Sequence, residues 1–308
     1  MKYLAFLITF LSIFSHASIE KYFKAFPAQE KNTEIKNIDF IYLINLDHRP
    51  EKLRKCLEEL APYGIHPKRF PAVNGWNIPL KDLNEMGLKY LPGMYAGKEH
   101  ANYFPINGSG FPEIVHLNSS CYGKTYFSGW MTRGAIGCAL SHLSVIKHAY
   151  DSGYNTIWIL EDDILACDNP HKLTELIDKL DHLREEEGWD LLYTDYDSLA
   201  GIDPKKSLEE QLPMKWRPDM PYICLSDFLE NTDISEDFAK IGSRIRTHSM
   251  ILRRSGMEKI LDFYKDRGIF IPYDHEISFV PDMRFYVLKH NIVTSMEAIS
   301  DTKNWFYN

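Results

Sequence analysis

The sequence is poor in cysteine and lacks the best-known motifs of cofactor and nucleophile chemistry. GxGxxG is absent after the first predicted strand, and GxxxxGK[ST] and GxSxG are absent too. This argues against a dinucleotide enzyme, a P-loop enzyme and a common serine hydrolase. The five cysteines form no CxxC pair and no Cys/His metal spacing, and their odd number argues against a disulfide framework, although an exported chain could hold one or two bridges. They are Cys56, Cys121, Cys138, Cys167 and Cys224.

An excess of positive charge is also missing. The chain has 43 Asp and Glu against 35 Lys and Arg, a net charge of −8, whereas a general nucleic-acid binder carries a basic excess. Hydrophobic residues make up 44% and charged residues 25%, as in ordinary soluble globular proteins. At 308 residues the chain can form one large α/β domain or two smaller ones. We therefore expect no nucleic-acid partner.

The N-terminus has the layout of a secretory signal peptide. In MKYLAFLITFLSIFSHAS a lysine precedes an apolar stretch that ends at Phe14, and small residues then place a cleavage site after Ala17. The stretch is shorter than the ~20 residues of a spanning helix, and no second segment approaches that length. We predict a signal peptide or signal anchor at 1–17, a linker or frayed helix at 18–37 and one domain at 38–308. A buried N-terminal helix is the alternative reading of the first segment.

The predicted location depends on that N-terminal segment. If it works as a signal, the protein is exported or belongs to the secretory pathway and its membranes. Otherwise we expect it in the cytoplasm, with peripheral membrane association.

Apolar runs and helical periodicity alternate along the rest of the chain. DFIYLIN at 39–45 is the short continuous apolar run of a buried strand. Asp47 is placed to cap the next helix, with Pro50 in its first turn and Leu53, Leu57 and Leu60 as its apolar stripe. The alternation predicts an α/β fold, a mainly parallel sheet with helices on both faces. Further strands are predicted at 66–73, 156–163, 189–197, 247–252 and near the C-terminus, and further helices at 134–154, at 170–187 and from Ser255.

Two long stretches, 77–129 and 198–238, show little periodicity. A stretch of this length without clear elements is typical of a functional loop or of an excursion over an active site. We predict that both are irregular.

Three acids, Glu161, Asp162 and Asp163, directly follow the apolar run TIWIL. In open α/β sheets ligands bind at the carboxyl ends of strands. Mg²⁺ and Mn²⁺ prefer carboxylate oxygens, and a cation would relieve the repulsion among the three acids. The alternatives are a general base and an acidic N-terminus of a following helix, where Asp and Glu favour the helix dipole.

Two further constellations compete with these acids. Asp195 and Asp197 form a literal D-x-D after a strand, and a period of two would turn both to the same side, where they could bind an ion or simply end an exposed strand. Cys138 and His142 stand at i and i+4 on a predicted helix. That spacing is compatible with a Cys/His nucleophile, but a small buried cysteine is the commoner case.

Three separated blocks carry a resemblance to a known family. They are IYLINLDHRPEKLRKCLEEL with RFPAVNG, then RGAIGCALSHLSVIKHAYDSGYNTIWILEDDI, and more weakly THSMILRRSGMEKIL with PYDHEISF. Together they resemble glycosyltransferase family 25, which includes bacterial lipooligosaccharide galactosyltransferases and animal collagen galactosyltransferases. GCALSH and LEDD at this spacing are its most specific part. The chain departs from the family at Ala135, where an acid is common, and in the long insertion 77–129.

The resemblance implies a GT-A fold, a Rossmann-like fold that binds nucleotide sugars. It also implies a nucleotide-sugar donor such as UDP-galactose, a Mn²⁺ or Mg²⁺ ion, and inversion at the anomeric carbon. The acidic motif of the family falls on Glu161, Asp162 and Asp163, which makes them the predicted metal ligands. The positions that match its nucleotide-binding segments are Asn45, Asp47, Arg49, Asn74, Gly75, Ser141 and His142.

Direct inversion requires one more carboxylate, which takes the proton of the acceptor hydroxyl. Asp274 in IPYDHEI is the candidate and Glu276 is the spare, although Asp274 could equally cap a helix after Pro272. Arg49 could contact phosphate or be an ordinary exposed arginine at a helix start.

The sequence therefore predicts a metal-dependent, inverting glycosyltransferase of the kind used in lipopolysaccharide biosynthesis. It would move a hexose, with galactose expected, from a UDP-sugar to a hydroxyl of a saccharide, lipooligosaccharide or glycoprotein acceptor. The alternatives are a metal-dependent phosphoryl-transfer or hydrolytic enzyme and a catalytically inactive carbohydrate-binding relative.

Overall fold

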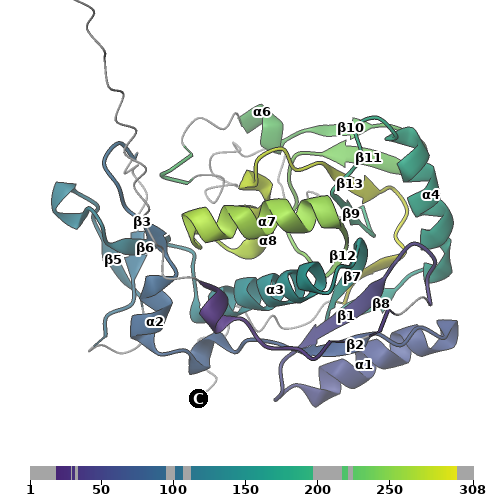
Figure 1. Ribbon diagram of the computed structural model, residues 1–308, viewed down its shortest axis with the longest axis horizontal. Helices are drawn as coiled ribbons and strands as arrows, with labels where there is room; N and C mark the ends of the chain where they lie inside the picture. Colours follow the sequence, from purple (N-terminus) through teal and green to yellow (C-terminus); the bar gives the residue numbers. More distant parts are fainter. Residues whose placement is uncertain are drawn as a thin grey trace, which may run out of the picture.

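An eight-stranded sheet forms the centre of the protein (Figure 1). The structure is a computed structural model in which residues 19–28, 30–31, 34–94, 101–106, 112–196, 217–220 and 225–296 are described, so the predicted signal peptide lies outside it. The strands follow one another across the sheet in the order β10-β11-β13-β9-β12-β7-β1-β2. Their bounds are β1 (Phe40–Asn45), β2 (Lys68–Pro71), β7 (Thr156–Glu161), β9 (Leu191–Tyr193), β10 (Asn231–Asp233), β11 (Phe238–Ile241), β12 (Ser249–Arg253) and β13 (Phe285–Leu288).

Strand direction is mixed across this sheet. β2, β1 and β7 are parallel, as are β9 and β13. β12 is antiparallel to both of its neighbours, and β10, β11 and β13 alternate in direction. The predicted α/β class is confirmed, but the sheet is not mainly parallel. The pattern could not show this, because β12 lies in the middle of the sheet and its buried residues read as the same continuous apolar run as a parallel strand.

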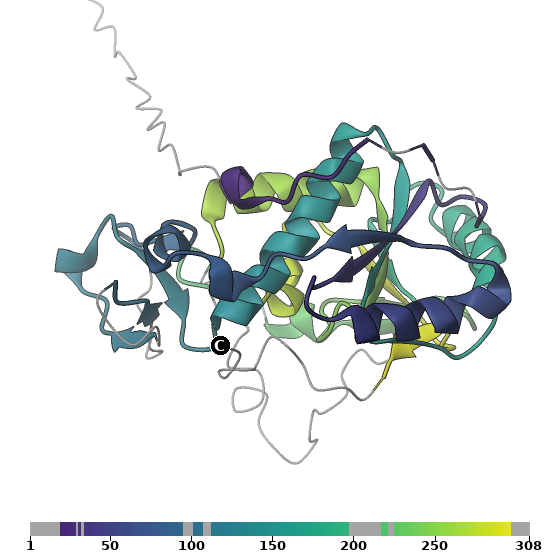
Figure 2. The same ribbon diagram turned by 90° about the horizontal axis from the view of Figure 1, so that it is seen from below.

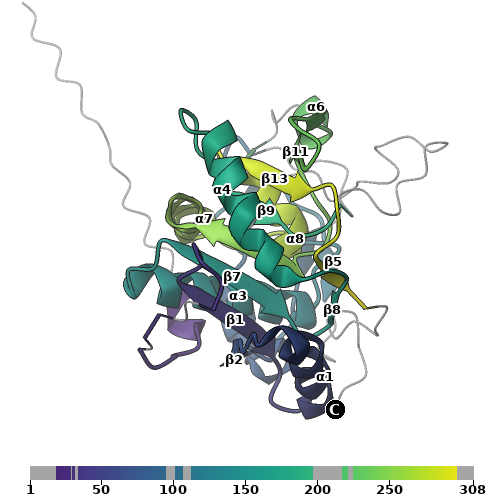
Figure 3. The same cartoon turned by 90° about the vertical axis from the view of Figure 1, so that its right-hand side faces the viewer.

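Helices cover both faces of the sheet, as predicted (Figure 3). On one face the side chains of Tyr42 and Ile159 pack with Leu140 and Ile260 of α3 and α7. On the other face Leu43 packs among residues of α1 and α4. The period of two along each strand therefore divides one buried run between two cores. The helices are α1 (Pro50–Leu60), α2 (Leu80–Glu85), α3 (Arg133–Asp151), α4 (Leu173–Leu183), α6 (Leu225–Phe228), α7 (Arg254–Arg267) and α8 (Tyr273–Glu276), with 3₁₀ turns η1 (Ile19–Tyr22), η2 (Ala61–Tyr63), η3 (Gly75–Asn77), η4 (Ser119–Cys121), η5 (Pro170–Lys172) and η6 (Ile277–Phe279).

The first helix differs in detail from its prediction. It begins at Pro50 with Arg49 at the N-cap, so Asp47 does not cap it. Its buried residues are Cys56 and Leu60, whereas Leu57 is 38% exposed and lies outside the apolar stripe. The predicted strand at 66–73 is limited to β2, and the helix predicted over 170–187 is η5 followed by α4.

The stretch 77–129, predicted to be irregular, contains a small sheet beside the N-terminal end of α3 (Figures 1 and 2). Its order is β3-β6-β4-β5, and the bridge from Gly87 to Ile269 joins it to the main domain. Strands of two to four residues give too short a pattern to be recognised in the sequence. The prediction for 198–238 was also incomplete, because α6 and β10 lie in its described part. The remaining strands are β3 (Leu88–Lys89), β4 (Ala101–Tyr103), β5 (Glu113–Val115), β6 (Thr125–Ser128), β8 (Ile164–Ala166) and β14 (Val293–Ser295).

Residues 19–28, predicted as a linker or frayed helix, pack against the domain. Ile19 is buried, and the Phe26 ring lies 4.9 Å from that of Phe70 and 5.0 Å from that of His148. The four cysteines of the described residues are free thiols, and Cys224 lies outside these residues. Among the helices that the structure describes, none has the length and apolar character that crossing a bilayer requires.

Candidate functional site

The three acids lie where β7 ends. Glu161 is the last residue of β7, and the chain then enters β8 at Ile164, which pairs with β14. No helix follows Asp163, so the alternative that these acids cap a helix is wrong. The parallel strand β1 ends beside β7, and its last residue, Asn45, lies at the same edge.

Glu161 is fixed by two donors. Its Oε1 accepts hydrogen bonds from His142 Nε2 at 2.9 Å and from Thr247 Oγ1 at 2.8 Å. Burial raises the pKa of Glu161, but these hydrogen bonds and the charge of His142 outweigh burial and hold the pKa below its usual range. The His142 ring also stacks on Tyr273 of α8 at 4.5 Å. Glu161 therefore links the end of β7 to α3 and to the turn before β12.

Asp162 faces the end of β1. Asn45 Nδ2 donates to Asp162 Oδ2 at 2.7 Å, and Lys52 Nζ lies 3.6 Å from Asp162 Oδ1. Arg69 Nε in turn donates to Asn45 Oδ1 at 3.0 Å, which fixes the orientation of the amide. A chain of polar contacts thus runs from β2 through β1 to the acids.

Asp163 is the least satisfied of the three acids. Its Oδ1 atom is buried and has no hydrogen-bond partner among the described residues. Burial and the negative charges of Glu161 and Asp162 raise the pKa of Asp163 to about 7, against smaller opposing effects of His248 and Lys52. A buried carboxylate oxygen without a donor is costly unless a proton or a cation occupies the site.

The acids line a cavity together with most of the predicted nucleotide-binding residues. Asn45, Asn74, Gly75, Ser141 and His142 are all brought to it. Its lining residues are Ile44, Asn45, Leu46, Lys52, Ala72, Val73, Asn74, Gly75, Trp76, Gly134, Cys138, Ser141, His142, Glu161, Asp162 and Asp163. Segments from β1, β2, α3 and β7 thus meet at one place.

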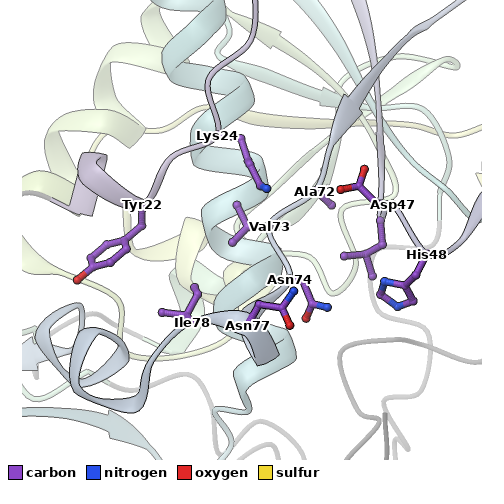
Figure 4. A pocket seen from close by; sticks show the side chains of 10 residues that line it. Tyr22, Lys24, Asp47, His48, Ala72, Val73, Asn74, Asn77 and Ile78 are labelled. Atoms are coloured by element: carbon purple, nitrogen blue, oxygen red, sulfur yellow. The ribbon is translucent and has the colours of Figure 1, made fainter. Parts of the chain in front are cut away.

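Two predicted residues lie outside this cavity. Asp47 lines a neighbouring hollow (Figure 4), and the charge-assisted hydrogen bond from Arg69 holds its pKa below the usual range. Arg49 lines neither space and lies 3.4 Å from Glu51. A contact between Arg49 and phosphate stays a prediction.

Gly75 and Ser141 position the backbone around the cavity. A Cβ atom on Gly75 would lie 1.8 Å from the carbonyl oxygen of Arg133, so only glycine allows the loop after β2 to approach α3 this closely. Ser141 Oγ accepts a hydrogen bond from Val73 N at 2.8 Å and donates one to Gly137 O at 2.7 Å. The missing Cβ of Gly75 and the hydroxyl of Ser141 therefore act on the shape of the site, and direct contact with a nucleotide stays a prediction.

The two candidate bases differ in exposure. The Asp274 side chain is 23% exposed and accepts hydrogen bonds from Arg246 N and from its neighbour His275 N, both at 3.0 Å. Pro272, not Asp274, is the N-cap of α8. Glu276 is fully buried, with Oε1 against the Arg217 guanidinium and within 2.8 Å of Phe270 N. Because Glu276 is fully buried, its carboxylate cannot contact the hydroxyl of an acceptor substrate. We therefore assign Glu276 a structural role and keep Asp274 as the candidate base.

Cys138 lines the same cavity as Glu161, Asp162 and Asp163. Its thiol, a ring nitrogen of His142 and an oxygen of Glu161 lie within 4.8 Å of one another. Burial and then the charges of Glu161, Asp274, Asp163 and Asp162 raise the pKa of the Cys138 thiol well above its usual range. Because the thiolate is the nucleophilic form, this environment argues against the Cys/His nucleophile. The stacking of Tyr273 on His142 places α8, which carries Asp274, beside α3.

Asp195, the rival metal ligand, is saturated with donors. It is fully buried, its Oδ1 contacts the Arg244 guanidinium, and its Oδ2 lies 3.0 Å from His248 Nε2 and 2.8 Å from Thr294 Oγ1. Burial alone would raise the pKa of Asp195, but the His248 hydrogen bond and the Arg244 charge hold it below its usual range. Asp197 lies outside the described residues. Asp195, the acid of the D-x-D that the structure describes, thus forms an internal ion pair with Arg244.

Sequence reasoning missed four residues that shape the site: Lys52, Arg69, Thr247 and Trp76. Lys52 lies in α1 and Arg69 lies in β2. In these segments the predicted functional residues were only those just before the helix and just after the strand. Thr247 reaches Glu161 because Ser249 of β12 pairs with Leu160 of β7. A local sequence pattern does not predict this strand register. Trp76 follows the matched Asn-Gly turn directly and was the easiest of the four to find.

The residues present fit a hard divalent cation. The oxygen without a donor is Oδ1 of Asp163, the neighbouring Asp162 adds a second carboxylate, and an all-oxygen set is what Mg²⁺ and Mn²⁺ prefer. Glu161 is less suited, because His142 and Thr247 already occupy its Oε1. We expect Asp162 and Asp163 to hold the cation and Glu161 to orient the strand end.

Fold and site together define an α/β domain with an acid-lined cavity at the carboxyl ends of parallel strands, the usual ligand position in such sheets. The model of the family described as glycosyltransferase family 25 (LPS biosynthesis protein) matches residues 38–277. The chain therefore belongs to glycosyltransferase family 25, which implies a GT-A-like fold.

Curated relatives support this assignment over about half of the chain. A glycosyltransferase 25 family member of Aedes aegypti is 29% identical over 168 residues, 54% of this chain and 23% of that protein. Human procollagen galactosyltransferase 2 is 27% identical over 171 residues, 55% of this chain and 22% of that protein. A rat protein named probable inactive glycosyltransferase 25 family member 3 is 26% identical over 155 residues, 50% of this chain and 22% of that protein. The chain thus spans about a quarter of the length of these relatives.

Proposed function

We propose that this chain is a metal-dependent, inverting glycosyltransferase that moves galactose from UDP-galactose to a hydroxyl group. The observation that carries the proposal is the buried, donor-free oxygen of Asp163 in a cavity lined by the residues that match the family motifs. Family membership supplies the glycosyltransferase class and a nucleotide-sugar donor. The human relative named procollagen galactosyltransferase supports galactose as the sugar.

The charges at the end of β7 suit a diphosphate only with a cation present. Asp162 and Asp163 would hold Mn²⁺ or Mg²⁺, which when bound neutralises the charge that develops on the leaving diphosphate. Asn45 and Lys52 keep Asp162 in place, and the hydrogen bond from His142 keeps Glu161 in place. These residues fix the acids before a ligand arrives, so the site need not reorganise on binding.

Asp274 is the proposed base that accepts the proton of the acceptor hydroxyl. Two backbone N–H groups orient its carboxylate, and part of the side chain stays exposed. The stacking of Tyr273 on His142 joins its helix to α3, so Asp274 is held on the same rigid frame as the acids of β7. A base on the opposite side of the sugar from the leaving group gives inversion in a single displacement.

The acceptor is proposed to be a saccharide, a lipooligosaccharide or a glycoprotein. Family 25 is described by lipopolysaccharide biosynthesis, and its human relative is named for procollagen, so both acceptor classes have support. We further propose that residues 1–17 direct the protein to a secretory or membrane location, with peripheral membrane association as the alternative.

Turnover of sugar nucleotides tests this function. Purified full-length protein, stripped with a chelator, would be assayed for UDP release from UDP-galactose with and without Mn²⁺, with UDP-glucose as a matched donor. We expect Mn²⁺-dependent release that favours UDP-galactose, and a β-configured product in NMR. No metal-dependent turnover with any sugar nucleotide, together with no nucleotide binding, would overturn the proposal.

A second candidate function is a catalytically inactive carbohydrate-binding relative, which the rat protein named probable inactive favours. Binding of UDP-galactose without any turnover would decide for it. The earlier alternative of a phosphoryl-transfer or hydrolytic enzyme has no support from the family assignment.

A further inference from the structure

A second hollow, whose lining residues Figure 4 shows, adjoins the acid-lined cavity. Leu46, Ala72, Val73 and Asn74 border both spaces, so the two adjoin along the loops that follow β1 and β2. The hollow measures about 480 Å³, within the ~300–1,000 Å³ of small-molecule sites. A ligand whose diphosphate lies at the acids could therefore extend its other half into it.

One wall of the hollow comes from the N-terminal segment 19–28, which precedes the residues 38–277 that match the family. The segment is fixed at several points. Lys21 forms an ion pair with Glu85 of α2 at 2.8 Å, the backbone N–H of Lys24 donates to Ser144 Oγ of α3 at 2.9 Å, and the Phe26 ring packs in the aromatic cluster on β1 and β2. The position of Lys24 is thus set by contacts on both sides of it.

The Lys24 side chain reaches into the hollow (Figure 4). Its ammonium has no hydrogen bond or ion pair with any described residue, and it contributes to lowering the pKa of Asp47, whose main partner is Arg69. Asn74 and Asn77 line the same space. The hollow therefore combines the ammonium of Lys24, two amides, the Asp47 carboxylate and the His48 ring with apolar side chains, a mixture that suits the carbonyl and hydroxyl groups of a nucleoside.

We propose that segment 19–28 completes the nucleoside half of the donor site and that Lys24 donates a hydrogen bond to the base or ribose of the sugar nucleotide. This inference rests on the proposed function, because it takes the diphosphate to lie at Asp162 and Asp163. It assigns a substrate contact to a residue outside the family match, and it makes the N-terminal segment a part of the enzyme.

The test measures binding of UDP and of pyrophosphate to the full-length protein by calorimetry, both with Mn²⁺. Lys24→Met is the variant, and Lys21→Met is the matched control on the same segment, since Lys21 is paired with Glu85 and does not line the hollow. Both side chains are exposed, so neither change should alter folding, which thermal melting would verify. We expect Lys24→Met to weaken UDP binding about tenfold, the usual effect of losing one charged hydrogen bond, and to leave pyrophosphate binding unchanged.

Each other outcome has a distinct meaning. Unchanged UDP binding by Lys24→Met overturns the inference. Equal weakening of UDP and pyrophosphate also overturns it, because the lysine would then act on the diphosphate by charge alone. If the wild-type protein binds pyrophosphate but not UDP, the nucleoside assignment falls; if it binds neither, the proposed function falls with it. In turnover assays the same variant should raise KM for the donor and leave kcat unchanged.

Discussion

Two strands of the same sheet end in acids, and the acids behave in opposite ways. Asp195 after β9 is surrounded by Arg244, His248 and Thr294, and its pKa is low. Asp163 after β7 has one oxygen without a donor, and its pKa is raised to about 7. A carboxylate with donors on both oxygens stabilises the fold, whereas a carboxylate left open is costly to the fold and available to a ligand. For these two acids the number of donors, and not the acidic motif, distinguishes the structural carboxylate from the one open to a ligand.

Removing the saturated acid should have the largest effect. Asp195→Ala leaves the buried Arg244 guanidinium without its counter-charge, and we expect the free energy of unfolding to fall by about 3–5 kcal/mol. Urea denaturation followed by circular dichroism measures it. If Asp195→Ala is as stable as the wild type, the ion pair is not structural and the contrast with Asp163 fails.

Removing the open acid should affect activity and spare the fold. We expect Asp163→Ala to lower transfer about 10²–10³-fold, the usual effect of losing one group that stabilises developing charge, with unchanged or higher stability. The assay is UDP release with Mn²⁺, and the unfolding curve is the control. Near-normal transfer by a folded Asp163→Ala protein would remove Asp163 from the site.

The contributions of the two acids to stability should change with pH in opposite directions. The pKa of Asp163 is about 7 in the folded state, above its unfolded value of ~3.9, so its contribution to stability is full below pH ~4 and declines by up to about 4 kcal/mol as the pH rises to 7. The lowered pKa of Asp195 means that its contribution is present above pH ~4 and is lost only as the pH falls through its folded-state pKa.

Metal-free unfolding curves between pH 3 and 8 measure this difference, with Asp163→Asn and Asp195→Asn as references. Burial also raises the pKa of Glu276 to about 7, so part of the loss of stability between pH 4 and 7 has another origin. The loss should be smaller in Asp163→Asn than in the wild type and unchanged in Asp195→Asn. The same slope in both variants would contradict the assignment.

A matched pair of threonines gives the smallest and most selective effects. Thr294 donates to Asp195, and Thr247 donates to Glu161. We expect Thr294→Val to cost about 1–2 kcal/mol of stability with normal transfer, because it removes one of several donors to a buried charge. Thr247→Val should lower transfer several-fold, since Glu161 then loses one of the contacts that orient the strand end. If Thr294→Val lowered transfer and Thr247→Val lowered only stability, the end of β9 would be the functional one and the end of β7 the structural one.

Much of the candidate site was predictable because its residues belong to local patterns. Glu161, Asp162 and Asp163 follow an apolar strand, and Asn74 with Gly75 marks a turn after another, so both were placed at the carboxyl edge of the sheet. The α/β class and the cover of helices on both faces followed from the alternation of the same patterns. Strand direction and the small sheet in 77–129 did not, because short or fully buried strands carry no signal of their partners.

The sequence by itself therefore determined where the acids stand along the chain and that they end a buried strand. Only the tertiary structure decided which acid is open. The donors that saturate Asp195 come from residues 49 to 99 positions away in the sequence, and Thr247 reaches Glu161 across 86 positions. Hydrogen bonds act over about 3 Å, so the state of each carboxylate depends on which distant strands fold beside it.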